Sequence, residues 1–292
     1  MKSPWVTILF VLMAGLMAPS IQGGNISSGG YEDALSAYEA GEYVRARRLL
    51  EPLARAGDAR AQFKLGVLYS EGWGVEQNLD RAIYWYRRSA EAGLPKAQYN
   101  LAHVHLTRIM SGRYTEEDVE QALHWFEKAA ATGMARATSA LGGMYWGGFG
   151  VKEDPVRARS YFESAAAMGN ARANFALGII YMYGEGVARD DAMAADYFAR
   201  AAEAGDTDGI YYLGMLYYEG RGVPKDDARA FELISRAAEL GNFRGYFGMY
   251  EIYRWGYMGQ EVDLKKALFW LRKYCRAQEK VSYAQCMDRH LP

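Results

Sequence analysis

The sequence repeats itself about every 36 residues, and this period restricts the chain to a narrow set of folds. The clearest copy runs from Asn170 to Gly205. One position of the repeat recurs at intervals of 36, 40, 36, 36 and 36 residues, at Gly66, Ala102, Gly142, Gly178, Gly214 and Tyr250. Repetition at this length predicts small helical units that stack on their neighbours and form one elongated domain.

The first half of each unit carries the pattern Ala-x-x-x-Leu-Gly-x-x-Tyr. In the clearest copy these residues are Ala173, Leu177, Gly178 and Tyr181, and their spacing places them on one face of a helix. A Gly-x-Gly-Val turn follows at residues 184–187. Its first glycine falls where a helix favours a left-handed residue after its last turn. No strand precedes these glycines, so they do not form a phosphate-binding loop.

The second half of each unit predicts another helix. It starts with a short hydrogen-bond acceptor four residues before an Ala, and we interpret these acceptors as N-caps rather than catalytic carboxylates. They are Asn78, Asp118, Asp154, Asp190, Asp226 and Asp263. A pair of large side chains such as Tyr197-Phe198 follows, and then an Ala-rich end. Large rings beside small Ala residues favour a packed core, so we predict that these rings are structural.

These strings together resemble the Sel-one-like repeats, a branch of the tetratricopeptide superfamily, over about residues 31 to 275. The resemblance implies antiparallel helix pairs that stack into a right-handed superhelix with a concave binding face. It also implies adaptor or scaffold work and brings no shared catalytic residues. We therefore predict an all-α, right-handed α-solenoid of about six helix-turn-helix repeats of about 36 residues. Capping helices are expected at both ends.

The ends of the chain differ from the repeats. Residues 1–20 combine a positive start, an apolar run from 5 to 17 and small residues, which predicts a signal peptide and an exported, periplasmic or secreted protein. An uncleaved anchor is the alternative, although the run is short for a membrane span. We expect a flexible lead-in at 21–30, an N-terminal capping half-repeat at 31–57, the repeat array at 58–275 and a C-terminal cap at 276–292.

Bulk charge argues against two classes of partner. The chain has 34 Lys and Arg against 35 Asp and Glu, a balance that favours neither nucleic acid nor an anionic membrane surface. Any membrane contact is expected only through an uncleaved signal anchor. The four histidines do not predict a metal site, because His105 occupies a slot that is Tyr in the other repeats and His103 points elsewhere on the helix. We predict no metal and no cofactor.

The only two cysteines, Cys275 and Cys286, follow the last repeat. In an exported chain an even pair predicts a disulfide. The bridge would staple a short C-terminal helix over the end of the stack. The alternative is a pair of reactive thiols.

Basic residues recur six positions before the repeated glycine, in the first turn of the first helix. The helix dipole disfavours cations there, so helix stability does not explain them. Tetratricopeptide geometry would place them on the concave face, where they suit an acidic extended peptide or an anionic glycan. They are Arg60, Lys96, Arg136, Arg172 and Arg244, and the one remaining repeat has an acid, Asp208, at this position. The alternative is pairing with acids of neighbouring repeats, such as Glu91, Glu203 and Glu239.

Two further features are candidates for partner contact. Trp73 and Phe149 occupy the open position of their turns, and packing on the next loop is the alternative. Thr107 to Thr115 replaces one turn with a longer segment, which is either a contact loop or a tolerated insertion.

The favoured function is an exported, non-enzymatic scaffold for protein–protein interaction, acting as an adaptor in envelope assembly, secretion or cell contact. A carbohydrate-binding module for peptidoglycan or exopolysaccharide is the first alternative. A hydrolytic enzyme is the second, although no nucleophile, base and orienting group come together at the repeat positions. The sequence leaves the identity of the partner, the pathway and the oligomeric state open.

Overall fold

The computed structural model describes residues 28–278 and 282–290, and all regular structure in these ranges is helical. The predicted signal peptide lies outside the described residues. The helices form two compact units that divide inside α4, after Ala82. The first unit contains α1 (Ser28–Glu39), α2 (Tyr43–Arg55) and α3 (Ala59–Glu71), and α4 (Leu79–Glu91) spans the division. Helix α1 starts three residues before the predicted start of the capping half-repeat at 31.

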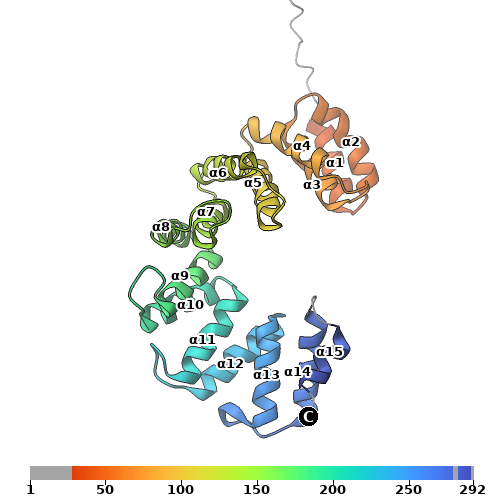
Figure 1. The fold of residues 1–292 in the computed structure, drawn as a ribbon. Helices are drawn as coiled ribbons and strands as arrows, with labels where there is room; N and C mark the ends of the chain where they lie inside the picture. The colour runs from red at the N-terminus through yellow and green to blue at the C-terminus, as the bar shows by residue number, and fades with distance from the viewer. Residues whose placement is uncertain (1–27, 279–281, 291–292) are drawn as a thin grey trace, which may run out of the picture. The chain divides into compact units, whose positions relative to one another are not determined.

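The second unit continues the alternation of helices to the end of the described chain (Figure 1). Its elements are α5 (Pro95–Met110), α6 (Glu116–Ala131), α7 (Ala135–Gly147), α8 (Pro155–Ala167), α9 (Ala171–Tyr183), α10 (Asp191–Glu203), α11 (Thr207–Glu219), α12 (Asp227–Glu239), α13 (Phe243–Trp255), the 3-10 turn η1 (Tyr257–Gly259), α14 (Leu264–Ala277) and α15 (Tyr283–His290). Each helix packs mainly against the next one along the chain. This arrangement confirms the predicted α-solenoid.

Inside a repeat, the glycine of the Leu-Gly pair lets the two helices approach closely. A Cβ atom on Gly178 of α9 would lie 2.5 Å from ring atoms of Phe198 on α10, and one on Gly142 would lie 2.8 Å from Phe162. Both rings are buried, as the sequence predicted for the aromatic pair. The glycine is therefore the hole into which the second ring of the pair packs.

Between repeats, the second glycine of each turn makes the close approach. A Cβ atom on Gly186 would lie 2.8 Å from Pro155, the first residue of the preceding α8. At Gly222 it would overlap the backbone of Asp191, the first residue of α10. The residue between the turn glycines adds a bond at the same joint, because Arg221 pairs with Asp191 at 2.9 Å. The turn is thus the joint between successive repeats.

The predicted N-caps are present at five of the six positions. The side chains of Asn78, Asp154, Asp190, Asp226 and Asp263 accept hydrogen bonds from backbone amides in the first turn. Asp118 is the exception, and the prediction for it was wrong. Helix α6 begins three residues earlier, so Thr115 is the N-cap and Asp118 is its partner in a capping box.

Asp118 has a second role because the helix starts early. Its carboxylate is 2.7 Å from Nδ1 of His105, which occupies the predicted buried Tyr slot of α5. Arg108 donates a hydrogen bond to the same oxygen at 3.4 Å. Burial raises the pKa of Asp118, but hydrogen bonds from Thr115, His105 and Arg108 outweigh it and lower the pKa to about 2. The inserted segment is therefore an extra turn of α5 and a capped loop anchored on one buried acid.

The C-terminal end is closed by the predicted disulfide. Cys275 on α14 is bonded to Cys286 on α15, and both are buried with Met287, Tyr250 and Leu271. A bridge that spans 11 residues of sequence can stabilise the fold by about 2 to 3 kcal/mol. The short α15 thus covers apolar side chains of α13 and α14. Within the described residues no helix is long and apolar enough to cross a membrane.

Replacing Gly178 by Ala tests the packing inside a repeat. The added methyl group meets Phe198, so we expect a loss of about 1 to 2 kcal/mol in unfolding free energy despite the better helix propensity of Ala. Gly143→Ala is the matched control, because a Cβ atom there has no neighbour within 4 Å. The control should gain up to about 1 kcal/mol. Urea unfolding followed by circular dichroism measures both, and equal stability of the two variants would contradict the packing.

Lowering the pH tests the buried Asp118. Its folded-state pKa lies below the ordinary value of 3.8, so its contribution is present above about pH 4 and is lost as the pH falls towards 2. We expect Asp118→Asn to be less stable than wild type by about 2 kcal/mol at pH 6, and this gap in stability to shrink as the pH falls below 4, to about half at pH 3. Urea midpoints from pH 6 to pH 3 measure the gap. A gap that is constant over this range would disprove the assignment.

Candidate functional site

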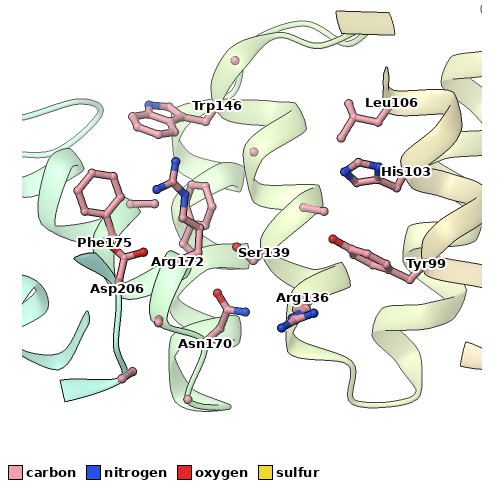
Figure 2. A pocket seen from close by; sticks show the side chains of 18 of the residues that line it. Tyr99, His103, Leu106, Arg136, Ser139, Trp146, Asn170, Arg172, Phe175 and Asp206 are labelled. Atoms are coloured by element: carbon pink, nitrogen blue, oxygen red, sulfur yellow. The ribbon is translucent and has the colours of Figure 1, made fainter. Parts of the chain in front are cut away.

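A cleft of about 930 Å³ opens over α7, between α5 and α9 in the second unit. Figure 2 shows Tyr99, His103 and Leu106 pointing from α5 towards α7. Arg172 and Phe175 of α9 line the opposite wall. We call this site the α7 cleft. It is formed by the first helices of three successive repeats, which carry the Leu-Gly pattern. Its lining includes Arg136 and Arg172, two of the residues that we expected on the binding face.

The cleft is open because the side chains of α7 are small where those of its neighbours are large. Its floor consists of Ser139, Ala140, Gly143 and Gly147. The position of Ser139 is Tyr99 in the preceding repeat and Phe175 in the next, and the position of Gly143 is His103 in the preceding one. A Cβ atom on Gly143 would have no neighbour within 4 Å. Aligning the repeats with one another would have revealed this run of small residues.

Rings of the hydrophobic core hold the two walls in place. Tyr99 packs edge-on against the fully buried Phe126 at 5.7 Å between ring centroids, and Phe175 lies 5.8 Å from Phe198. On the α5 wall, His103 lies 6.0 Å from the Tyr99 ring. Wall side chains that pack on core rings lose little conformational freedom when a ligand binds.

The two ends of the cleft differ in chemistry. Trp146, in the last turn of α7, packs on Phe162, and its indole N–H donates a hydrogen bond to Glu185 of the next turn. Phe149 also lines the cleft, half-buried and close to Gly147. Arg136 lies ten residues before Trp146, at the opposite end of the helix. The cleft therefore has an apolar end and a cationic end about 15 Å apart along α7.

Arg136 is the available cation of the cleft. It is exposed, and its side chain makes no ion pair or ring contact within the described part of the chain. Arg172 is already engaged, because it pairs with Asp208 at 3.3 Å and lies 4.9 Å from the centre of the Phe175 ring. Asp206 at the rim caps α11, and burial raises the pKa of its carboxyl group although the Gly209 amide and Arg172 act in the opposite direction.

The predicted row of cations is thus interrupted. Its one acidic member, Asp208, lies between two of the others and pairs with Arg172 and, at 3.9 Å, with Arg244. This is the neighbouring-repeat pairing that the sequence left open, but through Asp208 rather than Glu203 or Glu239. Lys96 is exposed on α5 and does not line the cleft.

The candidates of the first unit are described separately. Arg60 pairs with Asp58 at 3.3 Å and lies 4.1 Å above the Tyr31 ring. Trp73 stacks on Tyr43 at 5.0 Å between centroids and remains 39% exposed. Both side chains therefore have partners within their own unit.

The cleft offers binding groups rather than a catalytic arrangement. Ser139, His103 and Asp206 all line it, but within the described ranges no hydrogen bond joins any two of them. A nucleophile needs such a bond to its base. No cluster of three or more His, Cys, Asp or Glu among the described residues could hold a metal ion. Among the described residues, the cleft presents flat rings, the guanidinium of Arg136 without an ion pair, and an open floor.

Comparison with solved structures supports the fold. A Sel1 repeat protein from Oxalobacter formigenes has 29% identity and a TM-score of 0.77, with 85% of this chain and 100% of that chain covered. A protective antigen of uropathogenic Escherichia coli with an SLR fold has 29% identity and a TM-score of 0.69. That match covers 89% of this chain and 59% of the antigen.

Sequence comparison gives the same relationship. A putative sel1-like repeat-containing protein, L21, of Acanthamoeba polyphaga mimivirus is 37% identical over 60 residues, which are 20% of this chain and 11% of the viral protein. A family model of the Sel1 repeat matches residues 59–94, 95–133, 135–170, 171–206, 207–242 and 248–278. These stretches make up most of the sequence, and the chain therefore belongs to the Sel1 repeat family.

Proposed function

We propose that this protein is an exported, non-enzymatic scaffold that binds an acidic, extended segment of a partner protein in the α7 cleft. Proteins built from Sel1 repeats are generally non-catalytic and serve protein–protein interaction. The observation that carries the proposal is the free Arg136 at one end of a cleft whose walls are aromatic and whose floor is small.

The size of the cleft favours a peptide segment. Neighbouring helices of a packed face lie about 8 to 10 Å apart, so a segment that crosses from α5 over α7 to α9 spans roughly 20 Å. An extended chain covers this distance with about six residues. A carboxylate of the segment reaches Arg136, which can form charge-assisted hydrogen bonds. Apolar side chains of the segment fill the space above Gly143, between Tyr99 and Phe175.

The proposed location outside the cytosol follows from the N-terminal sequence. Residues 1–20 have the composition of a signal peptide. The Cys275–Cys286 disulfide is compatible with an oxidising compartment outside the cytosol. We propose that the scaffold works as an adaptor in the envelope or outside the cell.

Selection from a displayed library of random 12-residue peptides tests the site. We expect the wild-type protein to enrich sequences with Asp or Glu next to apolar residues. Arg136→Glu should lower the affinity for the selected peptides by about 10- to 100-fold, because a charge-assisted hydrogen bond is replaced by charge repulsion. Gly143→Phe should also prevent binding of the selected peptides, because the added ring fills the cleft. Fluorescence anisotropy with the selected peptides measures both effects.

Two matched controls separate site effects from general ones. Arg236→Glu makes the same charge change on an exposed residue of α12, and Gly143→Ala leaves the floor open. Both should bind like wild type. If neither Arg136→Glu nor Gly143→Phe weakens the selected peptides, the α7 cleft is not the site. Failure to select peptides, together with Gly143→Phe-sensitive retention on peptidoglycan or exopolysaccharide beads, would favour the carbohydrate-binding alternative.

A further inference from the structure

Cations are concentrated in the last repeat. The segment from 264 to 290 contains seven Lys and Arg and two Asp and Glu, whereas the whole chain has 34 and 35. Helix α14 itself carries five cations and no acid, at Lys265, Lys266, Arg272, Lys273 and Arg276. The balanced totals hide this segregation, so the sequence argument against an anionic membrane surface does not apply to α14.

Three of these cations and one ring form a stripe along the helix. Lys265, Phe269, Arg272 and Arg276 are spaced by four, three and four residues and so share one face. We call them the α14 stripe. All four are exposed, and the Phe269 ring is 51% exposed. Among the side chains that the structure describes, the three cations have no ion pair and no contact with a ring.

The stripe is not needed to hold the fold together. The opposite face of α14 carries Ala267, Leu271 and Cys275, which are buried in the last core cluster. This face packs on α13 and, through the disulfide, on α15. The stripe therefore lies on the exposed face of α14, where Lys273 also lies 5.0 Å from the centre of the Phe269 ring.

Exposed apolar side chains lie at the N-terminal end of the same helix. Trp255, Tyr257, Val262 and Leu264 are 54%, 42%, 60% and 67% exposed. Val262 and Leu264 line one hollow together with Lys265 of the stripe, and a Cβ atom on Gly256, between the two rings, would lie 3.4 Å from Val262. Trp and Tyr rings prefer the headgroup level of a bilayer, and aliphatic side chains prefer the region just below it.

We propose that the α14 stripe, with Trp255, Tyr257, Val262 and Leu264, binds the surface of a bilayer that contains anionic phospholipids. Lys and Arg are attracted to the negative potential of such a surface. The stripe runs along the exposed face of one helix, whereas an extended peptide is better held by a groove like the α7 cleft. A flat, deformable and uniformly charged surface matches three cations spaced along one exposed helix face. This contact is independent of the proposed peptide binding.

Co-sedimentation of the full chain with vesicles tests the proposal. We expect binding to vesicles with 30% phosphatidylglycerol in phosphatidylcholine and at least tenfold weaker binding to phosphatidylcholine alone. Lys265→Glu/Arg272→Glu should reduce binding to the anionic vesicles at least tenfold. Phe269→Ser should reduce it severalfold while the dependence on salt concentration stays the same.

The control is Arg229→Glu/Arg236→Glu on α12. These exposed residues have the same seven-residue spacing and give the same change in net charge. All variants carry the same residues 1–27, so any membrane affinity of that segment cancels in the comparison. The control should bind like wild type. Equal binding by wild type and Lys265→Glu/Arg272→Glu, or an equal loss in both double variants, would overturn the proposal.

Discussion

The solenoid of the second unit depends on how closely the turn of one repeat can approach the helix start of the repeat before it. Gly222 and Gly186 have positive φ angles of 70° and 71° and leave no room for a side chain against Asp191 and Pro155. A glycine satisfies both demands, since it adopts this conformation freely and lacks a Cβ atom. Hydrogen bonds from Arg189 and Arg221 hold the pKa of Asp191 well below its usual range, so the joint keeps its ion pair at neutral pH.

Because these joints and the close helix contacts at glycine recur in similar form in several repeats, they carry little information about a partner. Surfaces that could recognise a particular partner are found where a repeat departs from the pattern. In α7 the floor residues are small, and the neighbouring helices provide walls that pack on Phe126 and Phe198. In α14 the outer face is cationic. A rigid stack can present both surfaces without ordering either of them on binding.

Local features of the sequence predicted the local features of the structure. Spacing and turn glycines placed the helices, and the short acceptors placed five caps, because each depends on residues a few positions apart. Asp118 escaped prediction because Thr115, three residues upstream, offered a competing cap and His105 offered a buried partner. The cleft also escaped, since it depends on differences among α5, α7 and α9 that a pattern averaged over the repeats removes. The sequence placed Asp208 in the row of cations, but its pairing with Arg172 and Arg244 depends on contacts between repeats that the pattern does not give.

The central claim is that the α7 cleft is the contact surface for a partner segment. The most direct test replaces Tyr99 with photoreactive benzoylphenylalanine in the producing cell, with the same replacement at Tyr84, an exposed side chain on α4, as the control. Illumination should cross-link position 99 to an acidic segment of one protein, which mass spectrometry identifies, and Arg136→Glu should abolish the product. The absence of a product at position 99, or an equal yield of the same product at position 84, would contradict the account.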